Sequence, residues 1–211
     1  MKGTFVTFEG CEGSGKSTQL KLLARRLDEA GVDYILTREP GGSPISERIR
    51  EIILDKDNTS MCDECETLLY AAARIQHLKE RIIPALEQGK LVICDRYFHS
   101  SLAYQGIARG LGVQYVASVN SFAVTKCRPD LTVFLDIPPE RAFARKHGAD
   151  KDDRMEQLGM AFHNKVYNGY LSLLADYPEM CPVDCSGTKY QTSDKIWQLF
   201  VERGIVKQNK N

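Results

Sequence analysis

The chain contains, from position 10, the run Gly10-Cys11-Glu12-Gly13-Ser14-Gly15-Lys16-Ser17, which matches the pattern G-x-x-x-x-G-K-[ST]. Glycines let backbone N–H groups converge on a polyphosphate, and a helix N-terminus adds partial positive charge. Lys16 would reach the β- and γ-phosphates, and the Ser17 hydroxyl would bind Mg²⁺. We therefore expect a nucleoside triphosphate to contact the residues of this phosphate loop and the next one: Gly10, Cys11, Glu12, Gly13, Ser14, Gly15, Lys16, Ser17 and Thr18.

The phosphate loop alone does not identify the phosphate acceptor, because GTPases, motor ATPases and small-molecule kinases all use one. A guanine-specifying N/T-K-x-D segment is missing from the sequence. The nearest candidate, Thr125-Lys126-Cys127-Arg128, lacks the aspartate. The sequence therefore favours adenine over guanine.

Further segments carry residues suited to a second, anionic ligand. Arg38-Glu39-Pro40-Gly41-Gly42 follows the second predicted strand, and Asp95-Arg96-Tyr97 follows the third. The latter continues into Ser100-Ser101-Leu102-Ala103-Tyr104-Gln105-Gly106, while Tyr70-Ala71-Ala72-Ala73-Arg74 lies on a predicted helix. A guanidinium binds phosphate through two parallel hydrogen bonds, and a carboxylate at the end of a strand can hold Mg²⁺ through water.

Together with the phosphate loop, these segments resemble the thymidylate kinase family, in its bacterial form, from Phe5 to about Phe200. The resemblance implies transfer of a phosphoryl group from ATP to dTMP, giving dTDP, with Mg²⁺ as cofactor. It also implies a homodimer. The alternative is another nucleoside monophosphate or deoxynucleoside kinase of the same fold.

The resemblance also implies roles for single residues on the acceptor side. Arg96 resembles the arginine that holds the acceptor phosphate, and Arg50 matches a position near the same phosphate. Asp95 joins Ser17 as a Mg²⁺ ligand. The residues expected to bind the substrate are Glu39, Pro40, Arg50, Tyr70, Arg74, Arg96, Ser101, Tyr104 and Gln105.

Base recognition follows the same logic. Tyr70 stands where the family usually has a phenylalanine that stacks on thymine, and Arg74 matches the arginine that bonds its O4 atom. Their spacing of four places both on one helix face. Ser101 matches the residue at the N3 edge, with Gln105 nearby, and Tyr104 matches the ring beside C2′. The alternative for Tyr70 and Tyr104 is burial in the core.

Glu12 is an acid inside an anion-binding loop. Bacterial members of the family often carry an acid there that positions the acceptor sugar, and they place catalytic arginines in a lid. The corresponding flap offers Arg141, Arg145, Lys146 and Arg154, and Asp153-Arg154-Met155-Glu156 matches the family's D-R-x-E. The catalytic residues that we expect are Lys16, Arg96, Arg145, Arg154 and Glu12.

Short apolar runs must position these groups. They predict strands at Thr4–Glu9, Asp33–Thr37, Leu91–Cys94, Leu131–Leu135 and, weakly, Pro182–Asp184, with helices such as Ser17–Ala30 between them. Alternating strands and helices indicate an α/β protein with an open, doubly wound parallel sheet of about five strands and helices on both faces, here the P-loop kinase fold. We expect a single nucleoside monophosphate kinase domain over 1–211, with a mobile lid at about 141–155.

The composition excludes several other classes. Lys and Arg number 28, as do Asp and Glu, so nucleic acid and anionic membranes are not expected partners. The start of the chain shows no export signal, which favours the cytoplasm and free thiols for the seven cysteines. Cys62/Cys65 and Cys181/Cys185 offer the alternative of a zinc site, although Cys62 and Cys65 are expected in the first turn of a helix. Cys11 is expected to confer sensitivity to thiol reagents.

Overall fold

The computed structural model describes residues 3–145, 154–155 and 158–207. Its core is a sheet in which every neighbouring pair of strands is parallel, in the order β2-β3-β1-β4-β5. The strands confirm the predicted ones to within two residues at each end: β1 (Thr4–Glu9), β2 (Tyr34–Arg38), β3 (Leu91–Asp95), β4 (Leu131–Asp136) and β5 (Met180–Asp184).

The strand order creates a crevice at one edge of the sheet. The chain leaves β1 towards β2 on one side and leaves β3 towards β4 on the other, although β1 and β3 are neighbours. Connections that diverge from adjacent parallel strands open a gap beyond their carboxyl ends. The phosphate loop follows β1 and Arg96 follows β3, so both segments enter this gap.

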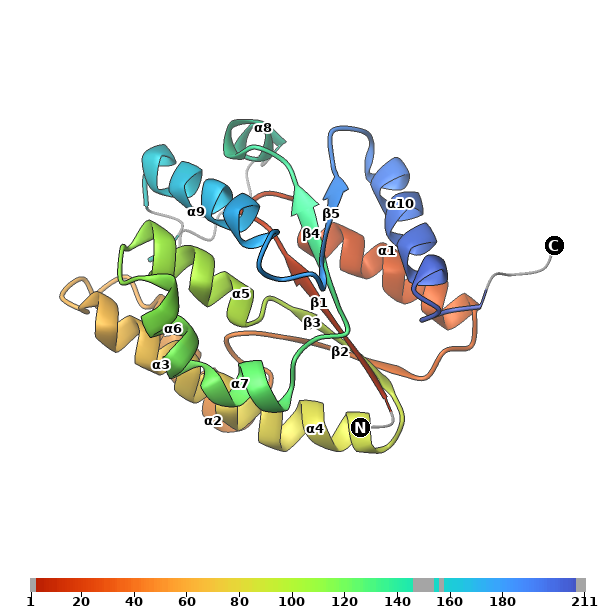
Figure 1. The fold of residues 1–211 in the computed structure, drawn as a ribbon, viewed down its shortest axis with the longest axis horizontal. Helices are drawn as coiled ribbons and strands as arrows, with labels where there is room; N and C mark the ends of the chain where they lie inside the picture. Colours follow the sequence, from red (N-terminus) through yellow and green to blue (C-terminus); the bar gives the residue numbers. More distant parts are fainter. Residues whose placement is uncertain (1–2, 146–153, 156–157, 208–211) are drawn as a thin grey trace.

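Helices cover both faces of the sheet (Figure 1). One face carries α1 and α10, and most of the remaining helices lie over the other. Their bounds are α1 (Lys16–Glu29), α2 (Pro44–Leu54), α3 (Asp63–His77), α4 (Ile83–Glu87), α5 (Phe98–Ser101), α6 (Val113–Val119), α7 (Ser121–Lys126), α8 (Pro139–Arg145), α9 (Met160–Leu173) and α10 (Lys189–Glu202). The π-helical turns η1 (Leu78–Ile82) and η2 (Leu102–Ala108) extend α3 and α5.

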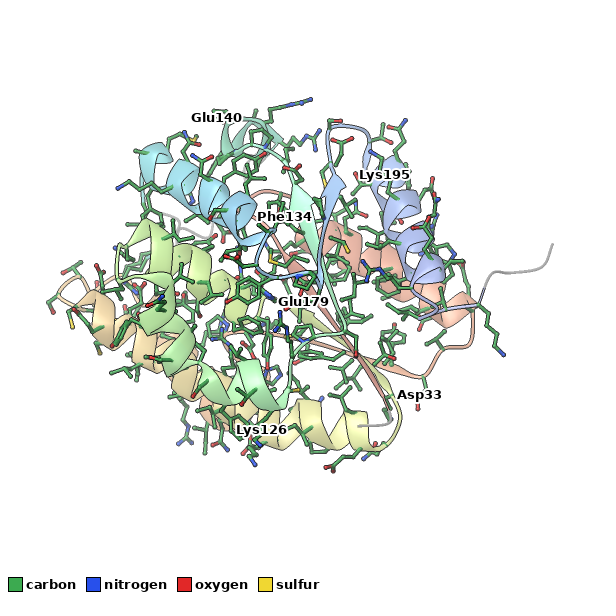
Figure 2. All side chains as sticks on the ribbon, in the orientation of Figure 1. Asp33, Lys126, Phe134, Glu140, Glu179 and Lys195 are labelled. Carbon is green, nitrogen blue, oxygen red and sulfur yellow. The ribbon has the colours of Figure 1, made fainter. Side chains whose placement is uncertain are left out.

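Alternation along the strands divides the core in two. Val6 of β1 packs with Leu23 of α1 and Phe200 of α10 on one face. On the other face, Phe134 of β4 stacks on Tyr170 of α9 with ring centroids 5.1 Å apart, and Figure 2 shows Phe134 between the sheet and that helix. Strands buried on both faces need apolar residues at successive positions, which is why short continuous apolar runs predicted them correctly.

Several predictions about single elements can be compared with this fold. Cys62 occupies the N-cap position of α3, without a side-chain capping hydrogen bond, and Cys65 lies in the first turn, as predicted. The centre of the expected lid, 146–153, lies outside the described residues. Within the part of the chain that is described, no helix combines the length and apolar character needed to cross a bilayer.

Candidate active site

A cleft of about 920 Å³ opens at the carboxyl ends of β1 and β3. Among the residues expected to bind nucleotides or to catalyse, only Gly10, Cys11 and Arg154 do not line it. The cleft therefore collects Glu12, Gly13, Ser14, Gly15, Lys16, Ser17, Thr18, Glu39, Pro40, Arg50, Tyr70, Arg74, Asp95, Arg96, Ser101, Tyr104, Gln105 and Arg145.

The phosphate loop packs tightly against α8. Gly13 has a φ of 73°, a conformation that side chains disfavour. A Cβ atom at Gly13 would lie 2.9 Å from the carbonyl oxygen of Ala142 in α8, closer than a side chain tolerates. The glycine therefore allows the loop to touch the helix that leads into the lid region.

Lys16 lies at the start of α1 with only 8% of its surface exposed. Its ammonium group donates to the carbonyl oxygens of Gly10 at 3.0 Å and Cys11 at 3.2 Å. Burial, together with the nearby charge of Arg96, lowers the pKa of Lys16. A partly desolvated cation held by two neutral acceptors is well placed to bind a polyphosphate.

Arg96 follows β3 in the left-handed conformation, with a φ of 68°, and is the one residue other than glycine with positive φ in the described chain. This backbone turn, stabilised by a 2.9 Å hydrogen bond from its N–H to Phe8 O, directs the side chain back over the phosphate loop. Its guanidinium pairs with the Glu12 carboxylate and donates to Gly10 O at 3.1 Å. It also lies 5.2 Å from the centre of the Tyr104 ring. Strain of this kind is typical of functional positions.

Asp95 and Ser17 offer oxygen atoms suited to Mg²⁺. Both line the cleft, and the Oδ1 atom of Asp95 is buried without a hydrogen-bond partner among the described residues. A buried carboxylate oxygen without a partner is costly unless a cation or water binds it. The donor set, a carboxylate and a hydroxyl beside the phosphate loop, fits a hard divalent cation.

Glu39, at the end of β2, anchors a buried polar network. Its carboxylate accepts a hydrogen bond from Arg74 Nε at 2.6 Å and contacts His77 Nδ1 at 3.1 Å. His77 Nε2 contacts the Thr37 hydroxyl at 2.7 Å, so both ring nitrogens are engaged. Because Glu39 and Arg74 are each nearly fully buried, the pair fixes the position of the arginine.

Arg74 keeps one nitrogen for a ligand. Its Nη1 atom donates to Ser101 Oγ at 3.0 Å and to Asn120 Oδ1. Nε donates to Glu39. The remaining nitrogen, Nη2, has no acceptor among the described residues. Tyr70, one helical turn earlier on α3, also lines the cleft and is half-buried. The spacing of four places Tyr70 and Arg74 on one face of α3, and both line the cleft. Their binding to one base stays a prediction.

Comparison with known proteins shows the family of this chain. A profile of the family described as Thymidylate kinase matches residues 8–196. The chain belongs to the thymidylate kinase family. It is 51% identical to the thymidylate kinase of Finegoldia magna over 202 residues, covering 96% of this chain and 100% of that protein. It is 51% identical to the Clostridium novyi thymidylate kinase (84% and 87% covered) and 48% identical to that of Syntrophotalea carbinolica (92% and 93%).

The two lid arginines lie apart from each other in this thymidylate kinase family member. Arg145, at the end of α8, donates to the carbonyl oxygens of Cys185 at 2.8 Å and Ser186 at 3.1 Å, on the loop between β5 and α10. Arg154 does not line the cleft; it donates to the Glu66 carboxylate at 2.5 Å and to Ile53 O at 2.9 Å. A catalytic role for either arginine would require these contacts to be exchanged for phosphate, and it stays a prediction.

Arg50 is also turned towards protein atoms. Its Nη1 donates to Pro40 O at 2.9 Å, and Arg38 Nη1 donates to the same oxygen at 2.8 Å. Both arginines line the cleft, so the Pro40 carbonyl gathers two cations at its rim. The expected position of Arg50 near an acceptor phosphate is compatible with this arrangement.

The support beneath Arg96 was not predicted from the sequence. Glu9, the last residue of β1, is fully buried and accepts hydrogen bonds from Tyr97 N at 2.8 Å and Tyr170 OH at 2.8 Å. Its Oε2 atom also accepts from the Ser100 hydroxyl at 2.5 Å, and Ser100 in turn contacts Arg96 Nη1 at 3.3 Å. A charged residue that ends a fully buried strand was the available signal.

The loop after β5 was missed as well, since no motif marks it. Cys185, Gly187, Thr188, Lys189 and Thr192 line the cleft on the side of Arg145. Thr188 caps α10, and its hydroxyl accepts from Gln191 N at 3.3 Å. The loop and the first turn of α10 therefore form part of the cleft wall.

The expectation for Cys11 is wrong. Its side chain is 1% exposed, and burial raises the pKa of its thiol to about 12. Thiol reagents attack the thiolate. Cys11 should resist them because its side chain is buried and because its thiol stays protonated.

Proposed function

We propose that this protein transfers the γ-phosphoryl group of ATP to dTMP, producing ADP and dTDP. One observation carries the proposal: Lys16 and Arg96 both donate to the carbonyl oxygen of Gly10, at 3.0 and 3.1 Å. Lys16 belongs to the loop for the donor phosphates, and Arg96 is the proposed clamp of the acceptor phosphate. Phosphoryl transfer needs these two phosphates side by side, and the two cations are side by side.

The pyrimidine of dTMP would occupy the end of the cleft lined by Tyr70, Arg74, Ser101 and Gln105. There, Arg74 Nη2 would donate to the carbonyl oxygen at C4 of the base, and the Tyr70 ring would stack on it. Tyr104, 6% exposed, would border the sugar and leave little room for a 2′-hydroxyl. These contacts favour a deoxynucleoside monophosphate with a C4 carbonyl.

The attacking oxygen of dTMP is an ionised phosphate oxygen, so the reaction needs positioning and charge neutralisation rather than a strong base. When bound, Mg²⁺ held by Ser17 and, through water, by Asp95 would neutralise charge on the donor phosphates. Lys16 and Arg96 would orient the two phosphates, and Glu12 would hold Arg96 in place. Arg145 and Arg154 are proposed to add positive charge from the lid when they leave their present acceptors.

The homodimer implied by the resemblance is part of the proposal. Ile45, Ile49 and Ile52 form one stripe on α2, and Leu68 and Ile75 form a parallel stripe on α3. Four of these side chains are between 40% and 54% exposed, which is unusual for adjacent helices of a monomer. We propose that a second copy covers these stripes. In contrast, Val116 of α6 is 0% exposed and belongs to the core.

The proposed location is the cytoplasm. All seven cysteines are free thiols, as in proteins of reducing compartments, and three of them are at least partly exposed.

A coupled assay with ATP and a panel of acceptors tests the function. We expect turnover of dTMP to exceed that of dUMP, CMP and AMP, and thymidine to be inactive because it offers no phosphate. Lys16→Met serves as the control for contaminating kinases and should abolish turnover. Faster turnover of any acceptor other than dTMP would contradict the proposal, and hydrolysis of ATP without need for an acceptor would indicate a switch-type protein instead.

A further inference from the structure

Glu66 is a fully buried carboxylate next to the cleft that no part of the proposed mechanism uses. It lies on α3 one helical turn before Tyr70 and two before Arg74, so the three side chains share a helix face. Burial of a carboxylate is costly unless it is paired and hydrogen-bonded, and Glu66 is both. A buried carboxylate this close to the cleft indicates a functional role.

Two arginines hold the Glu66 carboxylate in place. Arg109, just after η2, donates from Nη2 to Oε2 at 3.0 Å, and Arg154 donates from its own Nη2 to the same oxygen at 2.5 Å. Arg109 also donates from Nε to Oε1 at 3.4 Å, so the carboxylate keeps a guanidinium partner and acts only as an acceptor even when Arg154 moves to phosphate. Its other oxygen, Oε1, faces η2.

Gln105 of η2 donates from Nε2 to that Oε1 atom at 2.9 Å. Because an ionised carboxylate cannot donate, the amide nitrogen of Gln105 must face Glu66, and this contact fixes which way the amide points. Gln105 lines the cleft beside Arg74 and Ser101. The group that Gln105 leaves for a ligand is therefore its carbonyl oxygen.

We propose that Glu66 is a positioning residue that selects the base: by holding the amide of Gln105 in one orientation, it presents a carbonyl oxygen to the N3 edge of the pyrimidine. Thymine and uracil carry a hydrogen at N3 and donate to this oxygen. Cytosine carries a lone pair at N3, and two acceptors repel each other. A site whose polar group is left unpaired discriminates strongly against the wrong ligand.

The inference rests on the proposed function, since it assumes a pyrimidine nucleotide in this part of the cleft. It adds that discrimination between dTMP and dCMP depends on a residue that does not touch the substrate.

Glu66→Gln tests this role, because it keeps the shape of the side chain but allows position 66 to donate as well as accept. Gln105 can then turn its amide over. We expect the ratio of kcat/KM for dTMP to kcat/KM for dCMP to fall at least 10-fold, with a higher KM for dTMP and tighter competitive inhibition by dCMP. Glu179→Gln is the matched control: Glu179 is also a buried glutamate bound to an arginine, at 2.8 Å, but it does not line the cleft.

An unchanged ratio in folded Glu66→Gln would overturn the proposal, and so would an equal fall in Glu179→Gln. If Glu66→Gln does not fold, Gln105→Leu carries the test, because it leaves Glu66 with both arginines. A lower ratio in Gln105→Leu supports the proposal, and a ratio like that of the wild type overturns it. Wild-type protein that fails to phosphorylate dTMP would instead refute the proposed function, so the two failures are distinguishable.

Discussion

Lys16 and Arg96, which are far apart in sequence, both donate to one acceptor, the carbonyl oxygen of Gly10. Like charges at such separation repel, and the Glu12 carboxylate and the carbonyls of the phosphate loop offset that repulsion. When two nucleotides bind, their phosphates would take over this neutralisation. Lys16 and Arg96 therefore form a binding site for negative charge at the point where phosphoryl transfer is proposed.

The first prediction concerns Arg96. Arg96→Ala should lower kcat/KM for dTMP by roughly 10³-fold, the effect typical of an arginine that stabilises a transferring phosphoryl group. Arg96→Lys should lose less, because it keeps the charge but not the two-pronged geometry. Steady-state kinetics measure both, with thermal unfolding to verify the fold.

Arg128→Ala is the control for Arg96, since Arg128 pairs with Glu179 and does not line the cleft. It should leave kcat/KM for dTMP within about 2-fold of the wild type, as remote contacts usually act on stability alone. Wild-type kinetics in Arg96→Ala would remove Arg96 from the mechanism.

The second prediction compares two glutamates by burial. Glu39→Gln leaves the charge of Arg74 buried without its partner and should lower the free energy of unfolding by about 3 kcal/mol. Glu47→Gln removes the pair with Arg38, whose side chains are 45% and 40% exposed, and should cost less than about 1 kcal/mol. Urea unfolding of both variants measures the difference. If both variants lose the same free energy of unfolding, burial does not strengthen the pair of Glu39 and Arg74.

The third prediction concerns the acid stability contributed by Glu179. Although burial alone would raise its pKa, hydrogen bonds from His99 and Arg128 lower it to about 2 from the ordinary 4.5. The folded state therefore binds the proton less tightly than the unfolded state, so the stabilisation is full above about pH 4.5 and is lost as the pH falls towards 2.

The stabilisation contributed by ionised Glu179 is on the order of 3 kcal/mol. The gap in unfolding free energy between wild type and Glu179→Gln should thus be constant from pH 7 to 5 and narrow from pH 4.5 to 3. A gap that widens on acidification would have the wrong sign and would contradict the assignment.

The fourth prediction concerns the thiols. Cys62 and Cys65 are exposed at the start of α3, whereas Cys11, Cys94 and Cys127 are buried. Brief treatment with iodoacetamide at pH 8 should modify Cys62 and Cys65 and leave activity unchanged, as peptide mass spectrometry and assay would show. Rapid loss of activity that ATP prevents would instead identify Cys11 as accessible.

The fifth prediction concerns the stripes on α2 and α3. Leu68→Glu places a charge at a side chain that is 54% exposed, so it should turn a dimer into a monomer without unfolding it. Light scattering measures the particle mass. Tyr190→Glu, at a 62% exposed position on α10, is the control and should leave the mass unchanged. A monomeric wild type would refute the proposed homodimer.

The strands, the phosphate loop and the family were predictable from the sequence because their signals are local. Buried parallel strands need continuous apolar residues, and the loop needs glycines, Lys16 and Ser17 at set spacings. Likewise, Tyr70 and Arg74 are joined by helical periodicity alone. For these features, neighbours along the chain are also neighbours in the fold.

Only the tertiary structure could place the residues whose partners are distant in sequence. The burial of Cys11, the attachment of Arg154 to Glu66 and the support of Arg96 by Glu9 all join segments from different elements. Whether an arginine points at a ligand or at a carboxylate depends on which acceptor the packed fold brings within 3 Å. Long-range packing determines that acceptor, and the partner of a given arginine cannot be predicted from composition or motif spacing.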